Sequence, residues 1–387
     1  MRKSIRAAAI SMALLTVFGV CLCLWVYHAE QKGSGAGIAL GSQGNPENGL
    51  VARLRVQAGL PRQEENPESS GNPGAQAQEA SLIFAGDIYF SPYVLERYAN
   101  EGIQGAVSEK LLAEMKQGDI TMANEEFPFS IRGEQAPDKQ FTFRVDPSYV
   151  KALGEMGIDV VTLANNHALD YGAQALSDTF EALDGAGVAY VGAGADLARA
   201  SQPYFAQAAQ KTFGFLAASR VIPVPEWNIE YQQPGMLCTY DSKLLCEAIK
   251  KARQQCDFLT VYVHWGIERD NTPQDYQRQL AREYIDAGAD LVVGAHPHVL
   301  QGIEYYNGKP IAYSLGNYIF NQEIGMTALL KVVVPVEGQP RLQLIPAYAQ
   351  GAKTQEMPKE QAIDLYRFME GVSYGVHIGE DGFVMED

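Results

Sequence analysis

The sequence predicts an α/β domain in which helices flank a buried sheet core, preceded by one N-terminal transmembrane helix and a flexible linker. Three observations predict this organisation. A basic and then apolar segment opens the chain, residues 29–79 contain few large apolar side chains, and short apolar runs alternate with helix-like stretches from Ser81 onward. We therefore divide the chain into an anchor (1–28), a linker (29–79) and one globular domain (80–387).

The first 28 residues have the pattern of a membrane anchor. Arg2, Lys3 and Arg6 precede an apolar run from Ala7 to Tyr27, and a run of about 20 apolar residues is long enough to cross a bilayer as a helix. The positive flank should stay in the cytoplasm, which makes the remaining domain extracytoplasmic on a single-pass protein of the cell membrane. A cleaved signal peptide is the alternative, although no Ala-x-Ala site follows the apolar run.

The composition limits the partners of the chain. Residues 29–79 are rich in Gly, Ser, Gln, Asn, Pro and Glu, so they cannot bury enough surface to fold and are predicted to form a tether. The formal net charge is −16, and residues 81–387 carry all of the negative excess. An acidic domain is a poor partner for nucleic acid. The domain cysteines Cys238, Cys246 and Cys256 have no CxxC spacing, so a disulfide and free thiols both remain open.

Short apolar runs in the domain end abruptly in polar clusters. Runs of this kind fit strands that are buried on both faces. The predicted strands are 81–85, 119–123, 159–164, 258–263, 291–294 and 311–315, and the predicted helices are 105–117, 147–156, 172–186, 241–254 and 274–287. Residues 327–349 predict an antiparallel hairpin, and a final helix at 358–371 is expected to close the domain.

The polar clusters after these strands contain metal-binding side chains. Ligands of α/β proteins collect outside the carboxyl ends of the strands, and imidazole, carboxylate and amide oxygen are ligands of Zn, Mn and Fe. If the segment His296-Pro297-His298 stays extended, its period-two spacing directs both imidazoles to one face. The predicted metal ligands are Asp87, Glu126, Asn166, His264, His296 and His298.

Six ligands exceed the number that one tetrahedral ion uses. Two divalent ions (Mn, Fe or Zn) about 3.5–4 Å apart would use all six and leave room for a hydroxide, and phosphoester hydrolysis is the reaction best matched to such a pair. His167 is the predicted catalytic acid, held by Asp170. Three further residues have two interpretations each. Glu268 orients an imidazole or lies on the surface, Asn317 fixes the turn at the strand end or, as the less favoured alternative, binds a ligand, and Trp265 lines the pocket or the core.

Taken in order, these clusters resemble the CapA family of capsule synthesis proteins, also called poly-γ-glutamate synthesis proteins, which is similar to the calcineurin-like metallophosphoesterases. The matching motifs run from Phe84-Ala-Gly-Asp87 to Tyr313-Ser-Leu-Gly-Asn317. The most specific are Leu163-Ala-Asn-Asn-His-Ala-Leu-Asp-Tyr-Gly172, His264-Trp-Gly-x-Glu268 and Gly294-Ala-His-Pro-His-Val299. The resemblance implies a layered, metallophosphoesterase-like fold, metal-ligand positions for the six residues named above, and the acid position for His167.

The chain departs from the resembled patterns at two places. Asn124-Glu125-Glu126 stands where the family usually has Asn-Leu-Glu, so either glutamate could be the bridging ligand. Asp87-Ile88-Tyr89 stands where ordinary metallophosphatases have an Asp-x-His pair.

Three functions follow from these observations as hypotheses. The first is an extracytoplasmic metal-dependent hydrolase of the phosphoesterase type. The second is a non-catalytic subunit that handles or exports poly-γ-glutamate or another capsule polymer together with its synthase subunits. The third is a metal site that is kept only for stability.

Overall fold

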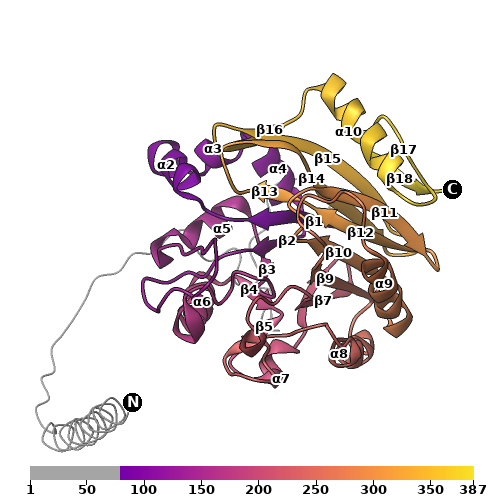
Figure 1. Ribbon diagram of the computed structural model, residues 1–387. Coiled ribbons are helices and arrows are strands. Elements are labelled where there is room, and N and C mark those ends of the chain that lie inside the picture. The colour runs from indigo at the N-terminus through magenta and orange to yellow at the C-terminus, as the bar shows by residue number, and fades with distance from the viewer. Residues whose placement is uncertain (1–78) are drawn as a thin grey trace, which may run out of the picture. The chain divides into compact units, whose positions relative to one another are not determined.

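The computed structural model describes residues 79–387 (Figure 1). The predicted anchor, and all of the predicted linker except its last residue, lie outside the described residues, and strand β1 begins at Glu79. Within residues 79–387, no helix combines the length and the apolar character needed to span a bilayer.

Two mixed sheets form the centre of the described domain. The larger sheet has ten strands in the order β17-β18-β15-β14-β1-β2-β3-β4, with β13 beside β1 and β16 beside β15. Its strands are β1 (Glu79–Ile88), β2 (Ile120–Glu125), β3 (Val160–Thr162), β4 (Ala189–Val191), β13 (Asn317–Ile319), β14 (Ile324–Pro335), β15 (Arg341–Gln350), β16 (Lys353–Glu356), β17 (Val376–Ile378) and β18 (Phe383–Glu386).

The smaller sheet has six strands in the order β11-β12-β10-β9-β7-β6. Its strands are β6 (Tyr204–Ala208), β7 (Lys211–Ser219), β9 (Phe258–His264), β10 (Leu291–Ala295), β11 (Leu300–Tyr306) and β12 (Lys309–Leu315). A separate two-stranded pair joins β5 (Ala193–Gly194) to β8 (Gly235–Met236). In both main sheets the strands that carry the predicted ligands run parallel to one another, so their carboxyl ends point the same way.

Helices cover the outer faces of the two sheets, as Figure 1 shows. The helices against the larger sheet are α2 (Pro92–Glu101), α3 (Ile103–Ala106), α4 (Glu109–Gln117), α5 (Lys151–Met156) and α6 (Gly172–Ala186). Against the smaller sheet lie α7 (Leu197–Ala200), α8 (Lys243–Arg253) and α9 (Asp275–Ala287). Helix α10 (Lys359–Val372) packs on β11 and β15, and short 3₁₀ turns lie at Pro147–Tyr149 and Pro225–Trp227.

Side-chain alternation explains why the sheets pack in this way. On β1, Ile83 and Ala85 enter the core below the helices, whereas Leu82 and Phe84 enter the core between the sheets. Successive side chains of a strand point to opposite faces, so a strand that is apolar at every position needs a partner layer on each side. The sequence-based prediction of strands buried on both faces is therefore confirmed, and the layers are helix, sheet, sheet and helix.

Most predicted elements occur at the expected places, with one correction at the C-terminus. The antiparallel hairpin is confirmed as β14 and β15, and the predicted last helix is α10. That helix does not end the fold, because β17 and β18 follow it and join the larger sheet. The sequence also did not predict the β6–β7 hairpin, whose turn residues Ala209 and Gln210 both adopt positive φ without being glycine.

Glycine allows two strand ends to approach closely beside the predicted site. A Cβ atom on Gly86 would lie 1.9 Å from the carbonyl oxygen of Gly316, and the amide of Asp87 donates to that same oxygen at 2.8 Å. A Cβ atom on Gly294 would lie 2.0 Å from the carbonyl oxygen of Tyr313. Only a residue without a side chain permits such contacts, so these glycines fix the spacing of the strands that lead to Asp87 and His296.

A buried acid lies at the end of β2. Glu125 is fully buried, neither of its carboxylate oxygens has a hydrogen-bond partner, and alternation places it on the same face as Ala123, toward the core below the helices. Burial raises the pKa of Glu125 well above its ordinary value, because desolvation penalises the charged form. The folded protein therefore keeps the Glu125 proton at a pH at which the unfolded chain has lost it.

We expect Glu125→Gln to stabilise the protein increasingly as the pH rises. Because the folded-state pKa is raised, the contribution of protonated Glu125 is fully present below the unfolded pKa. It declines above that pKa, by at most about 1.4 kcal/mol per pH unit. Urea unfolding of the full chain at pH 5 and pH 8 measures the difference. The exposed Glu247 supplies a matched control, Glu247→Gln. An equal effect of Glu125→Gln at both pH values would contradict the prediction.

Candidate metal centre

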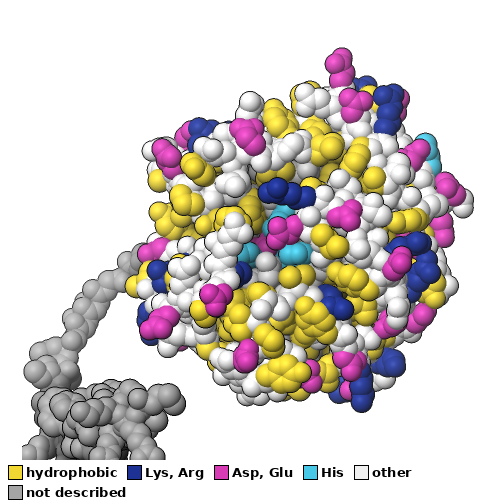
Figure 2. All heavy atoms as spheres, viewed as in Figure 1, with side chains coloured by type: hydrophobic (Ala, Val, Ile, Leu, Met, Phe, Trp, Pro, Cys, Tyr) yellow, Lys and Arg dark blue, Asp and Glu magenta, His cyan; other side chains and the backbone are white. Residues whose placement is uncertain are grey.

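The six residues predicted as metal ligands lie together at the carboxyl ends of the strands. The larger sheet contributes Asp87 from β1, Glu126 directly after β2 and Asn166 after β3. The smaller sheet contributes His264 as the last residue of β9, and His296 and His298 after β10. Figure 2 shows histidine side chains near the centre of the viewed face, with acidic and basic side chains beside them.

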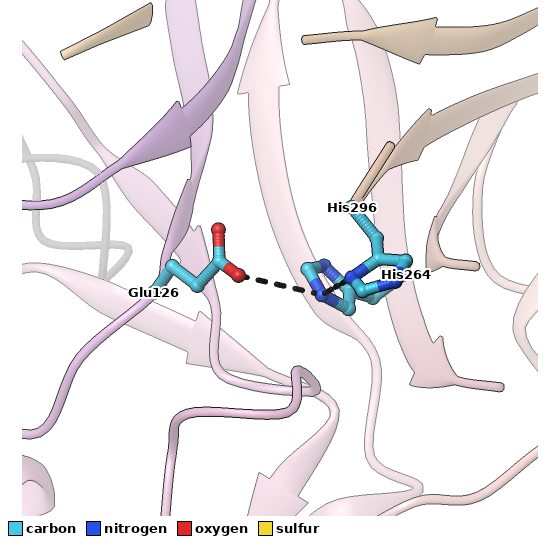
Figure 3. Close-up of side chains that lie close together, drawn as sticks. All are labelled: Glu126, His264 and His296. Carbon is cyan, nitrogen blue, oxygen red and sulfur yellow. Dashed lines mark hydrogen bonds and ion pairs between the residues drawn. The ribbon is translucent and has the colours of Figure 1, made fainter. Parts of the chain in front are cut away.

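One group of possible ligands is formed by Glu126, His264 and His296 (Figure 3). The Nε2 atom of His264 lies 2.7 Å from the Oδ1 atom of Asn166, 3.1 Å from the Nδ1 atom of His296 and 3.6 Å from the Oε1 atom of Glu126. Nitrogen and oxygen lone pairs from both sheets therefore meet around one point.

A second group is formed by Asp87, Glu126 and His298, so Glu126 belongs to both. The Nδ1 atom of His298 lies 3.4 Å from the Oδ2 atom of Asp87 and 2.8 Å from the Oδ1 atom of Asn317. A carboxylate shared by two ligand groups has the position of a bridging ligand. Glu125 faces the opposite way, which identifies Glu126 as the glutamate that faces the cluster.

The cluster contains a buried carboxylate that makes no hydrogen bond. Both oxygens of Glu126 are buried and have no hydrogen-bond partner. Burial raises the pKa of Glu126 well above its usual value, and the charge of Asp87 raises it further. Buried polar groups are nearly always hydrogen-bonded, so an unpartnered carboxylate beside three imidazoles is best explained by a cation that completes its coordination.

The histidines divide into two electrostatic types. Burial, followed by the neighbouring imidazoles, lowers the pKa of His264 well below its normal value. Burial and the charge of His298 lower the pKa of His296 to about 3. Burial also acts to lower the pKa of His298, but Glu126 and Asp87 outweigh it and raise this pKa to about 10. Neutral His264 and His296 offer lone pairs to a metal, and the field that favours a charge on His298 would also favour a metal cation.

A series of side-chain hydrogen bonds holds the strand ends in place. Asn124 donates to the Oδ1 atom of Asp87 at 2.7 Å. Asn165 donates to the Oδ1 atom of Asn124 at 3.0 Å and to the carbonyl oxygen of Glu125 at 2.7 Å. The amide of His167 in turn donates to the Oδ1 atom of Asn165 at 3.0 Å. Sequence reasoning did not single out Asn124 or Asn165, although both stand inside the quoted motifs.

The His296-Pro297-His298 segment is not extended as the sequence reasoning assumed. His296 has a φ of 97° and His298 a φ of 59°, because the chain bends directly after β10. Their rings nevertheless lie 5.7 Å apart between centroids. The bend, and not strand alternation, directs both imidazoles toward the cluster. Backbone conformations with positive φ cost free energy in residues other than glycine, and they are common at functional sites.

The predicted acid and its partner also lie at the site. The Nδ1 atom of His167 is 2.6 Å from the Oδ2 atom of Asp170, and its Nε2 atom is 3.9 Å from the Oε1 atom of Glu126. Burial lowers the pKa of His167, although Asp170 opposes that shift. The arrangement leaves the Nε2 atom of His167 facing the cluster of candidate metal ligands.

Lys139 and Phe143 join this pair from a loop that the sequence did not connect with the site. Lys139 contacts Asp170, the carbonyl oxygen of Asn166 and the ring of His167. Burial lowers the pKa of Lys139, against the effect of Asp170. The ring of Phe143 stacks on His167 at 4.0 Å between centroids. No spacing rule links residue 139 to residue 167, so only the fold identifies this contact.

The structure distinguishes between the two interpretations of Glu268 and of Trp265. Glu268 is exposed and makes no hydrogen bond to an imidazole within residues 79–387. Trp265 is fully buried and donates to the carbonyl oxygen of Tyr313 at 2.9 Å, which makes it a core residue.

Two residues beside the site have contacts that the sequence did not predict. Asn317, expected to fix a turn, faces His298. Tyr89, which stands where metallophosphatases have a histidine, stacks on Phe143 at 3.9 Å. In the described residues, Cys238, Cys246 and Cys256 are free thiols.

The residues present fit a divalent metal. The unpartnered oxygens of Glu126, the facing nitrogens of His264 and His296 and the amide oxygen of Asn166 are the donor types that such ions take. The two groups of possible ligands allow one ion or two.

Comparison with known proteins shows which family this chain belongs to. The family model described as "Bacterial capsule synthesis protein PGA_cap" matches residues 81–322. The PGA biosynthesis protein CapA of Bacillus subtilis is 34% identical over 274 residues, which cover 69% of this chain and 70% of that protein. The capsule biosynthesis protein CapA of Bacillus anthracis is 34% identical over 258 residues, covering 63% and 61%.

Among solved structures, the sulfate thiohydrolase SoxB of Thermus thermophilus matches with 12% identity and a TM-score of 0.39, covering 72% of this chain and 58% of that one. The match to the family model and the identity to the Bacillus subtilis relative suffice for the family: this chain belongs to the bacterial capsule synthesis protein PGA_cap family.

Proposed function

We propose that this protein acts in the synthesis of a capsule polymer such as poly-γ-glutamate, as a membrane-anchored, extracytoplasmic, metal-dependent hydrolase of the phosphoesterase type. The observation that carries the proposal is Glu126, which is buried, unpartnered and common to both ligand groups. Such a carboxylate is costly to keep in a protein interior unless a bound cation compensates it.

The residues that would hold the metal are Asp87, Glu126, Asn166, His264, His296 and His298, with Asn317 beside His298. When bound, a divalent metal supplies an activated water and stabilises charge on an ester oxygen. His167 exchanges a proton through its Nε2 atom, which faces the cluster, while Asp170 holds the Nδ1 atom. The ring of Phe143 stacks on His167, and the ring of Tyr89 stacks on Phe143.

The polymer part of the proposal rests on the relatives. Two of them are named as proteins of PGA or capsule biosynthesis. A non-catalytic, polymer-handling role for this chain is the second candidate, and the acidic net charge of −16 favours contact with an anionic polymer only through bound cations.

We expect the purified full chain to contain a divalent metal, and removal of the metal to destabilise it. A free metal concentration of about 100 times the dissociation constant adds about 2.7 kcal/mol to the free energy of unfolding. Removing the metal with a chelator should therefore lower the melting temperature. Elemental analysis with thermal unfolding measures both effects. Glu126→Gln and His296→Ala should lose metal. His377→Ala should keep it, because His377 is exposed and pairs with Glu370 at 2.9 Å. Equal metal content in all these variants would contradict the proposed ligand set.

We expect the metal-loaded full chain to hydrolyse phosphoesters, and His167→Ala to slow turnover by about 10²–10⁴-fold, the usual contribution of a positioned acid or base. Metal content should stay unchanged in this variant, since His167 is outside both ligand groups. Steady-state kinetics on a panel of phosphoesters tests this. Turnover that survives both His167→Ala and His296→Ala would refute the hydrolase and favour the non-catalytic role. If chelation lowers stability without removing any activity of the protein, the site serves structure alone.

We also propose that residues 1–28 anchor the chain and that the domain lies outside the cytoplasm, on the basis of the basic and apolar pattern described above. Protease added to intact cells should then cut within 29–79 and release the folded domain, whereas the same treatment of a cytoplasmic control protein should not. Retention of the intact chain in intact cells, with cleavage only after lysis, would place the domain inside.

A further inference from the structure

Lys139 is a partly buried cation beside the candidate metal ligands, and the proposed function gives it no role. Its side chain is 13% exposed, and its ammonium lies 5.3 Å from the centre of the Trp227 ring, which covers it. The ammonium contacts the Oδ1 atom of Asp170 and the carbonyl oxygen of Asn166, and it lies 3.0 Å from the Nδ1 atom of His167. One lysine therefore contacts a predicted ligand residue, the predicted acid and the partner of that acid.

The loop that carries Lys139 is built around Asp170. We name residues 130–145 the clamp loop. A bridge between Phe129 and Val145 closes its base, and its backbone donates twice to Asp170. The amide of Ala136 donates to the carbonyl oxygen at 2.7 Å, and the amide of Phe143 donates to the Oδ2 atom at 2.6 Å. The clamp loop thus fixes Asp170 in the backbone and in the carboxylate.

The donors and acceptors around His167 determine which of its ring nitrogens carries the hydrogen. An ammonium has donors only and an ionised carboxylate has acceptors only. The Nδ1 atom of His167 therefore faces a donor on Lys139 at 3.0 Å and an acceptor on Asp170 at 2.6 Å. The shorter contact assigns the ring hydrogen to the Nδ1 atom, and the bond of Lys139 to the Oδ1 atom of Asp170 leaves the Oδ2 atom to accept it. The Nε2 atom lies 3.9 Å from the Oε1 atom of Glu126 and faces the cluster of candidate metal ligands. In the neutral ring this nitrogen then carries no hydrogen.

We propose that Lys139 is a positioning residue that turns the Asp170 carboxylate toward His167, places the ring hydrogen on the Nδ1 atom and so reserves the Nε2 atom for proton exchange with the substrate. This inference rests on the proposed function, in which His167 is the proton-exchanging group. A merely structural lysine would secure the clamp loop and leave the ring hydrogen of His167 where it is.

The test reads the hydrogen position directly in the full chain, held in detergent with its metal removed by a chelator. Nuclear magnetic resonance of protein labelled with ¹⁵N-histidine resolves the two ring nitrogens of each of the 6 histidines, and His167→Gln assigns the His167 signals. Wild-type protein should show a protected Nδ1–H signal for His167. Lys139→Met should lose that signal, and Lys139→Arg, which keeps the charge and the donors, should retain it.

Lys151→Met is the matched control, because Lys151 is exposed and lies 5.9 Å from the Tyr98 ring, outside the site. An unchanged Nδ1–H signal in folded Lys139→Met overturns the proposal. So does loss of the signal in folded Lys139→Arg, which also decides the question if Lys139→Met does not fold.

Kinetics separate this inference from the proposed function. If wild-type protein turns over phosphoesters, Lys139→Met should reduce kcat by about 10²-fold with KM unchanged, since a displaced acid or base loses most of its contribution. Lys139→Arg should stay within about tenfold of wild type by the same reasoning. If wild-type protein shows no turnover, the hydrolase proposal fails, while the resonance of His167 still decides the role of Lys139.

Discussion

The candidate metal centre depends on a chain of amide hydrogen bonds that ties three neighbouring strand ends together. Asn124 holds Asp87, Asn165 holds Asn124, and the same Asn165 holds the amide of His167. Each of these side chains is buried, so each bond forms in a medium where leaving a partner unpaired would cost about 1–3 kcal/mol. These hydrogen bonds hold the ligand side chains in place before any ion arrives. Binding of an ion would therefore cost the protein little conformational freedom.

This rigidity has an electrostatic cost that the fold tolerates. Asp87 and Glu126 are both fully buried, and the pKa of Glu126 is raised by its burial and by Asp87. Isolated buried carboxylates are normally protonated or paired, and here the charges of His298 and Lys139 both act to lower the pKa of Glu126. Sites that withstand such repulsion are commonly functional, and the electrostatics therefore favour a metal centre at this cluster.

Much of the fold and of the ligand set could be predicted because both follow from local patterns. A strand that is apolar at every position must lie between two layers, and the polar residue at its end must then face a shared edge, as Asp87 and His264 do. Lys139 could not be predicted in this way. It stands in an irregular loop, and its contact with Asp170 depends on how that loop folds back. The left-handed bend at His296 and His298 was missed for a similar reason, since neither residue is a glycine that would indicate it.

The site also joins parts of the chain that are far apart in sequence. Asp87 and His296, 209 residues apart, are brought together by a bond between their own atoms, and each ligand group combines residues of both sheets. Contacts of such long range form late in folding, because the intervening chain must first lose its freedom. A nascent or unfolded chain therefore presents isolated imidazoles and carboxylates with little affinity for metal. If, as proposed, the domain binds a metal and folds outside the cytoplasm, that metal must come from the compartment outside the membrane, and the supply there would determine which ion the protein carries.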